Sequence, residues 1–136
     1  MFDLGMRRLS AKEGFRLNPE RLGQLFEQFV GLELRREIRS LGMTGIDICF
    51  WRDPDGPEVD WVVRSNGEWI PIEVKWTASP QKNDAKHLGV FMDEYNNKAK
   101  RGFIVCRTQV AQQITPRVRA ISWKDLPKII KSLING

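Results

Sequence analysis

The chain has 136 residues, of which 41% are hydrophobic and 29% are charged, and its formal net charge is +5. This size and composition are typical of one soluble globular domain and exclude a disordered or fibrous chain. No apolar run is long enough to cross a membrane, and the N-terminus lacks the pattern of a secretory signal, so we expect a cytoplasmic protein. We predict a single domain over residues 1–136, in which segment 1–17 is not assigned to a helix or a strand.

The first predicted helix begins at Asn18, Pro19 and Glu20 and runs to about Ser40. Asn18 can cap the helix, Pro19 loses no backbone hydrogen bond there, and Glu20 lies at the positive end of the helix dipole. Apolar residues then recur at steps of three or four, which predicts a stripe that is buried against the rest of the fold. These residues are Phe26, Val30, Leu34, Ile38 and Leu41.

Three strands are predicted to follow, because the sequence becomes rich in β-branched and aromatic residues. They cover residues 46–51, 58–63 and 69–76. Asn66 and Gly67 favour a type I′ hairpin between the second and third strands, since both residues tolerate positive φ. Pro71 cannot donate a backbone hydrogen bond, so regular pairing on one side of the third strand is expected to begin only after it.

A second helix is predicted to open at Ser79 and Pro80 and to end in the lysine-rich segment before Gly102. Its inner face consists of Ala85, Leu88, Phe91, Met92 and Tyr95. Two further strands, residues 102–106 and 118–122, and a last helix, residues 123–134, complete the order. The inner face of that helix consists of Leu126, Ile129, Ile130 and Leu133. The pattern predicts an α/β fold with a mixed sheet that the two longer helices cover.

Charged side chains interrupt the most apolar strands. Because side chains alternate along a strand, Glu73 and Lys75 share one face, and Asp60 on the preceding strand can face Glu73 across the hairpin. Two neighbouring carboxylates repel each other unless a cation neutralises them, and oxygen ligands favour Mg²⁺ or Mn²⁺. A metal, its water and a lysine amine can together hydrolyse a phosphodiester. The alternative is a structural ion pair on a solvated sheet face.

Glu27 continues the buried stripe of the first helix and is therefore expected to point toward the sheet. Gly23, one turn earlier, is expected to allow close approach of the helix. An acid on an apolar face requires a partner, which a metal site or Lys75 would supply.

The segment EVD, followed after a hairpin by IEVK, resembles the D…ExK signature of the PD-(D/E)xK nuclease superfamily, and LFEQF resembles the helix acid of many members. The resemblance implies a restriction-endonuclease-like αβββαβ core and a Mg²⁺-dependent or Mn²⁺-dependent nuclease acting on DNA. It implies that Asp60 and Glu73 are metal ligands, that Lys75 positions the water and that Glu27 is an accessory acid. Val59 replaces the proline of the family name, a departure that affects no ligand.

A longer resemblance is to the uncharacterised C-terminal domain of prokaryotic AAA-type ATPases. It is carried by FDLGMRR, GQLFEQFVGLEL, FWRDPDGPEVDWVV and IPIEVKW, and it continues through GFIVCR and ISWKDLP. No G-x-x-x-x-G-K-[ST] motif is present, so the resemblance implies a domain detached from its ATPase. Two other functions therefore stay open, a non-catalytic interaction module for an ATPase partner and a nucleic-acid binder with a spent site. Self-association also stays open.

Basic residues outnumber acidic ones after residue 60, as in polyanion-binding proteins, although many soluble proteins carry a similar excess. If the excess serves DNA, basic side chains flank the acidic cleft. Nucleic-acid contacts are predicted at Lys82, Lys86 and Arg107. The other flanking residues are Lys98, Lys100 and Arg101.

Several other side chains are predicted to be structural. His87, beside Lys86, is expected to be an exposed helix residue. Cys49 and Cys106 lie in apolar runs and are expected to be buried, reduced thiols. The strand tryptophans are expected to be core or lid aromatics rather than platforms for base stacking. They are Trp51, Trp61, Trp69 and Trp76.

Overall fold

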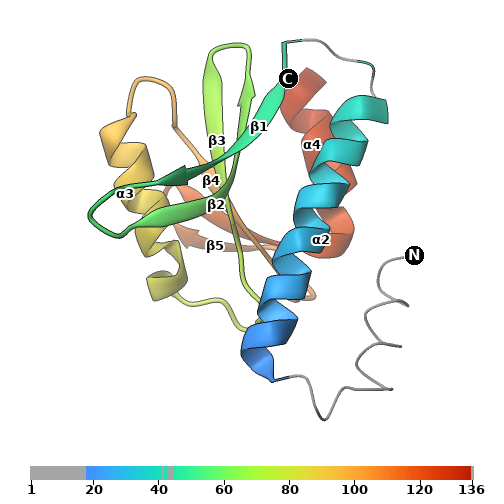
Figure 1. Ribbon diagram of the computed structural model, residues 1–136, viewed down its shortest axis with the longest axis vertical. Helices are drawn as coiled ribbons and strands as arrows, with labels where there is room; N and C mark the ends of the chain where they lie inside the picture. Colours follow the sequence, from blue (N-terminus) through green and yellow to red (C-terminus); the bar gives the residue numbers. More distant parts are fainter. Residues whose placement is uncertain (1–17, 41, 43–44, 136) are drawn as a thin grey trace.

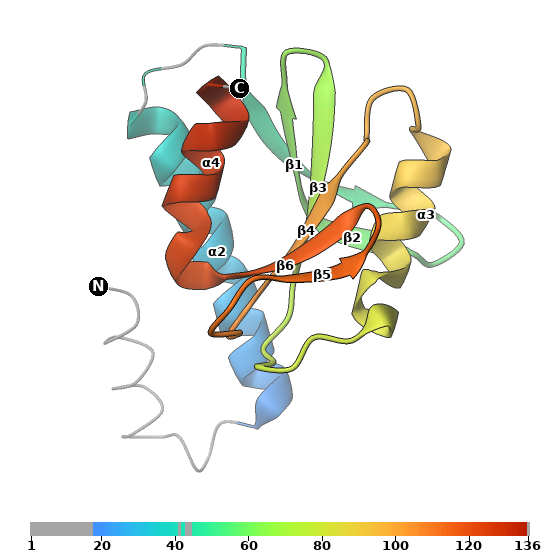
Figure 2. The same ribbon diagram turned by 180° about the vertical axis from the view of Figure 1, so that it is seen from behind.

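The computed structural model describes residues 18–40, 42 and 45–135, without the side chains of residues 133–135. A six-stranded sheet forms the middle layer, with α2 (Pro19–Ser40) and α4 (Leu126–Asn135) side by side on one face and α3 (Lys86–Glu94) on the other (Figures 1 and 2). The unassigned segment 1–17, Leu41 and the side chain of Leu133 lie outside the described residues.

The sheet has the strand order β1-β2-β3-β4-β6-β5. Its strands are β1 (Asp47–Arg52), β2 (Glu58–Ser65), β3 (Glu68–Val74), β4 (Gly102–Cys106), β5 (Gln112–Thr115) and β6 (Val118–Ser122). β4 pairs in parallel with β3 and with β6, and the other pairs are antiparallel. The predicted α/β class and mixed sheet are therefore confirmed.

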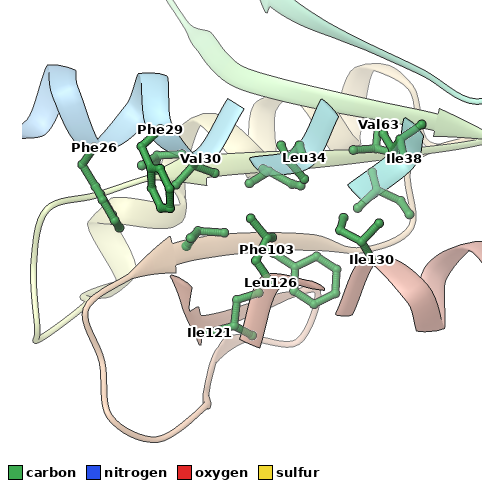
Figure 3. Close-up of a cluster of buried hydrophobic side chains, with 14 residues drawn as sticks. Phe26, Phe29, Val30, Leu34, Ile38, Val63, Phe103, Ile121, Leu126 and Ile130 are labelled. Carbon is green, nitrogen blue, oxygen red and sulfur yellow. The ribbon is translucent and has the colours of Figure 1, made fainter. Parts of the chain in front are cut away.

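The apolar stripe of α2 is buried against β2, β3, β4 and α4, as Figure 3 shows. Phe26, Val30, Leu34 and Ile38 are all buried, which confirms the predicted stripe for these residues. Asn18 caps the helix as expected, since its Oδ1 accepts a hydrogen bond of 2.8 Å from the backbone N–H of Arg21.

The hairpin between β2 and β3 forms as the sequence indicates. Asn66 and Gly67 have φ values of 52° and 81°, which the tight turn requires, and Ser65 pairs with Glu68 across it. Pro71 pairs with Val62 on the β2 side, whereas the pairing of β3 with β4 begins at Ile72. Pro71 thus turns its missing donor toward β4, as predicted.

The second helix begins later than the sequence analysis predicts. A short 3-10 helix, η2 (Lys82–Ala85), precedes α3, and a capping box between Gln81 and Asp84 opens it, so Ser79 is not the cap. Ser79 and Pro80 resemble a helix N-cap followed by a first-turn proline, which is why the sequence predicted the helix start there. Tertiary packing places the start at Gln81 instead. The predicted inner face is correct: Ala85, Leu88, Phe91 and Met92 are buried and Tyr95 is half-buried.

Strand β5 was not predicted. Its residues Gln112, Gln113, Ile114 and Thr115 are exposed or half-buried at the sheet edge, and such a polar edge strand lacks an apolar pattern.

The burial of one cysteine differs from the prediction, because Cys49 is only half-buried, whereas Cys106 is buried as predicted. Both are free, as predicted.

Among the described residues, no helix is both long and apolar enough to cross a bilayer.

The last predicted helix, residues 123–134, consists of two elements in the structure. The short 3-10 helix η3 (Trp123–Asp125) comes first and α4 follows it.

Helix α2 approaches the sheet most closely at Gly31 rather than at Gly23. A Cβ on Gly31 would lie 2.7 Å from Cε2 of Trp61, whereas a Cβ on Gly23 would meet nothing within 4 Å. The Trp61 indole cannot easily move away, because its Nε1 donates a 3.3 Å hydrogen bond to the Glu27 carbonyl oxygen and the Arg35 guanidinium lies 5.5 Å from its ring centroid. The expectation for Gly23 is therefore wrong.

Gly31→Ala is predicted to destabilise the protein by about 1–3 kcal/mol, because the methyl group overpacks against Trp61. Gly23→Ala is the matched control in the same helix and is predicted to be neutral or to stabilise by up to about 1 kcal/mol through helix propensity. Urea unfolding measures both. A Gly31→Ala protein as stable as Gly23→Ala would contradict this account of the interface between α2 and β2.

Candidate functional site

A β-bulge places Asp60 at the point where β1 and β2 lose their regular pairing. Cys49 pairs with Val62 and Trp51 with Val59, so Asp60 and Trp61 of β2 together oppose one residue of β1. Because of the bulge, Val59 and Val62 both pack on the α3 side although three positions separate them. Bulges often redirect a side chain beside a functional site.

The last regular pair of β2 and β3, counted from the hairpin turn, is Trp61 with Ile72. Asp60 and Glu73 lie one residue beyond this pair, on the side away from the turn. Oδ2 of Asp60 accepts a 2.8 Å hydrogen bond from the Val74 backbone N–H. Oε1 of Glu73 lies 3.4 Å from the Asp60 backbone nitrogen, which donates to it. The two carboxylates thus replace backbone pairing at the end of the hairpin, and Glu73 is only 5% exposed.

All four residues of the predicted site line one cleft, whose volume is about 380 Å³. Asp60 comes from β2, Glu73 and Lys75 come from β3 and the segment after it, and Glu27 comes from α2. Glu27 and Lys75 are half-buried. The structure therefore brings together the side chains that the sequence analysis selected, from three separate segments.

Three acids of the cleft, Glu27, Asp60 and Glu73, have raised pKa values. Burial raises the pKa of Glu27 from 4.5 to about 7, with further contributions from the charge of Asp60 and a hydrogen bond with it. Burial, followed by the charge of Glu73, raises the pKa of Asp60 from 3.8 to about 7. Burial also raises the pKa of Glu73. Crowded carboxylates of this kind favour a proton or a cation between them.

Lys75 is the lysine of the cleft, and its positive charge acts on all three acids. It lowers the pKa of Glu27, Asp60 and Glu73, opposing the effect of burial. Within the described part of the chain, Lys75 makes no direct ion pair with them. Its backbone N–H donates to the Val105 carbonyl oxygen at 3.0 Å, which ties it to β4.

The cleft also contains residues that the sequence analysis did not select. His87 is half-buried and lines the cleft, so the prediction of a merely exposed helix residue is wrong. Its Nδ1 lies 3.2 Å from the Glu58 carbonyl oxygen, and because a carbonyl only accepts, Nδ1 must carry the hydrogen. Only the tertiary packing of α3 against β2 brings His87 there, and no local pattern indicates it.

Two further residues belong to the surroundings of Asp60. Glu58 lines the cleft, and its two-residue spacing from Asp60 could have indicated this. Phe50, opposite the bulge, is 69% exposed and lines a smaller adjoining hollow together with Glu27, Glu58 and Asp60.

The predicted basic flank is only partly present. Arg107 lies beside the cleft, with its guanidinium 4.2 Å from the ring centroid of Trp76, a residue that lines the cleft. Lys82 and Lys86 are exposed on the segment that leads to His87, but they do not line the cleft.

The expectation for Lys98, Lys100 and Arg101 is wrong. They precede β4, which runs parallel to β3, so they lie at the end of the sheet opposite to Glu73. Arg101 is paired there with Glu68 beside the hairpin turn. The sequence pattern did not determine that β4 runs parallel to β3, and this direction decides where Lys98, Lys100 and Arg101 lie.

The tryptophans pack as core aromatics. Trp61 and Trp76 contact the core on the α2 side, and Trp51 and Trp69 contact the core on the α3 side. Trp51 and Trp69 join Phe91 and Tyr95 in an aromatic cluster.

The donor set of the cleft fits a hard cation held by two protein ligands. Mg²⁺ usually binds through one or two carboxylates and keeps several waters or substrate oxygens, and Asp60 and Glu73 offer such a pair. Within the described ranges, no group of three or more His, Cys, Asp or Glu side chains is arranged to hold a metal ion, so a cation here would depend on this pair alone. Any cation here would therefore have open positions for water and substrate.

Comparison with known proteins identifies a family. The family described as "Domain of unknown function (DUF4143)" matches residues 22–126, a segment that contains every residue of the predicted site. No curated protein matches the chain. Because the match covers most of the sequence, the chain belongs to the DUF4143 family.

Proposed function

We propose that this protein is a Mg²⁺-dependent or Mn²⁺-dependent nuclease that hydrolyses phosphodiester bonds of DNA, and that it is a member of the PD-(D/E)xK superfamily with a restriction-endonuclease-like fold. The observation that carries the proposal is the convergence of Glu27, Asp60, Glu73 and Lys75 on one cleft. Neither a surface ion pair nor an ordinary strand pattern accounts for three crowded acids with raised pKa values.

In this proposal each side chain has one task. Asp60 and Glu73 hold the cation, and their backbone hydrogen bonds keep both carboxylates at the end of the hairpin. A bound Mg²⁺ or Mn²⁺ stabilises negative charge on phosphate oxygens and lowers the pKa of water. The Lys75 amine orients the attacking water and adds positive charge beside the phosphate. Glu27 accepts hydrogen bonds from water in the cleft as the accessory acid.

Without divalent cations, stability is predicted to fall as the pH rises through about 7. Glu27 and Asp60 have raised pKa values in the folded state, so their protonated forms favour folding. That contribution is fully present below about pH 4 and is lost as both groups ionise near pH 7. Thermal unfolding in EDTA at several pH values measures the trend.

Asp60→Asn is the matched variant for this prediction. It removes one of the repelling charges and is predicted to flatten the fall in stability between about pH 4 and pH 7, the window between the unfolded-state and folded-state pKa values. Mg²⁺ or Mn²⁺ at pH 8 is predicted to raise the melting temperature of the wild type more than that of Asp60→Asn. Equal shifts in both proteins would show that Asp60 is not a ligand.

Lys75→Met is predicted to lower the rate of metal-dependent nicking by about 100-fold or more, while DNA affinity changes little, because one amine adds little to a multi-phosphate contact. Asp60→Asn is predicted to lose both the rate and metal affinity, since it removes an anionic ligand. Nicking of plasmid and single-stranded DNA, with calorimetry of Mg²⁺ and Mn²⁺, measures these effects. Lys131→Met, an exposed lysine of α4, is the control and is expected to match the wild type.

A wild-type protein that binds neither metal and nicks neither DNA would end the nuclease proposal. The acids would then be structural, and the remaining functions are a non-catalytic module for an AAA-type ATPase partner or a nucleic-acid binder. Pull-down with such an ATPase and DNA binding in EDTA distinguish these two.

A further inference from the structure

Five basic residues of the C-terminal half line a groove that shares no lining residue with the acidic cleft. This groove has a volume of about 510 Å³, larger than the cleft, and it lies between α4 and the strands β4, β6 and β5. Its basic lining residues are Lys100, Arg101, Arg117, Arg119 and Lys128. One carboxylate, that of Asp125, also lines it.

Partners outside the groove satisfy two of the five cations. Arg101 donates two hydrogen bonds to Glu68, at 2.9 and 3.1 Å, and Arg117 Nη2 lies 2.9 Å from Asp93 Oδ1. The other three, Lys100, Arg119 and Lys128, make no ion pair with any described residue. Three unpaired cations against the single Asp125 carboxylate give the groove a positive charge.

The free cations project over an apolar floor. Arg119 pairs with Phe103 of β4 on one side and with Gln113 of β5 on the other, and all three residues line the groove. Lys128 comes from α4, and Lys100 comes from the segment before β4. Because β6 and α4 are packed elements, the backbone positions of Arg119 and Lys128 are fixed before any ligand binds.

Without a bound metal ion, the acidic cleft is unfavourable for a polyanion. Five acids line it, Glu20, Glu27, Glu58, Asp60 and Glu73, against the single amine of Lys75 and the imidazole of His87. Phosphates would be repelled there, since affinity for nucleic acid depends on cations that neutralise phosphates. Beside the cleft Arg107 adds one cation, whereas three unpaired cations lie together in the groove.

We infer that the groove formed by Lys100, Arg119 and Lys128 is a second site, which binds the phosphodiester backbone of a nucleic-acid strand away from the acidic cleft. The inference rests on the proposed function, because the substrate of the cleft identifies the polyanion.

The test is binding of a labelled DNA strand in EDTA over a range of salt concentrations, measured by fluorescence anisotropy. Lys128→Glu is expected to weaken binding about tenfold at low salt and to reduce the slope of log affinity against log salt by about one. Lys131→Glu carries the same charge change on the same helix outside the groove lining and is expected to bind within about twofold of the wild type. Arg119→Gln and Lys100→Gln are expected to act like Lys128→Glu, and Lys100 is exposed, so its variant keeps the core intact.

Three results would overturn the inference: no DNA binding by the wild type, equal losses for Lys128→Glu and Lys131→Glu, or displacement of DNA by polyglutamate at equal charge concentration. The last would indicate an acidic protein as the partner. Because binding is measured in EDTA, it is independent of cleavage. If DNA binding needs Lys128 but no DNA is nicked, the groove is supported and the nuclease proposal ends. If DNA is nicked but Lys128→Glu binds as well as the wild type, the nuclease proposal stands and the groove is not the binding site.

Discussion

The contact between Trp61 and α2 connects the two parts of the molecule on which the cleft depends. The Trp61 indole packs against the backbone at Gly31 and donates its N–H to the Glu27 carbonyl oxygen. It therefore fixes the helix that carries Glu27 against the strand that carries Asp60, the residue before Trp61. Trp61 faces α2 by the ordinary alternation of β2, and the β-bulge beside it leaves Asp60 just beyond the regular pairing of β2 with β3. A loss of this contact would loosen the core and the cleft together.

The buried carboxylates of the cleft destabilise the folded protein. Glu73 is buried, and the strand positions around it, such as Ile72 and Val74, are apolar. Burying crowded carboxylates is unfavourable unless protons, hydrogen bonds or a cation compensate. Two backbone N–H groups and the charge of Lys75 offset part of this cost. Strain of this kind is typical of sites kept for chemistry, since a core would be more stable with apolar residues in their place.

Acidic side chains and unpaired basic side chains gather at two different surfaces of the protein. Acids gather where β2 and β3 end near the start of α2, whereas unpaired cations gather between α4 and the β4-β6-β5 half. A nuclease must both hold a polyanion and bring a cation to one phosphate, and one small cleft does both poorly because the charges needed are opposite. In the proposed nuclease, two separate surfaces on one sheet would resolve this conflict.

The sequence by itself determined the α/β class, the burial of the α2 stripe, the hairpin at Asn66 and Gly67, and the grouping of Asp60 with Glu73. All of these follow from local periodicity, turn chemistry or pairing between adjacent segments, which involve short separations along the chain. Helical phase also indicated that Glu27 points inward. Only the tertiary structure decided the rest. The placement of His87 and Glu27 at one cleft, the bulge opposite Phe50, the edge strand β5 and the basic groove all depend on how distant segments pack. The parallel direction of β3 and β4 sent Lys100 and Arg101 to the far end of the sheet, because pairing direction and register are set by contacts between residues far apart in the sequence.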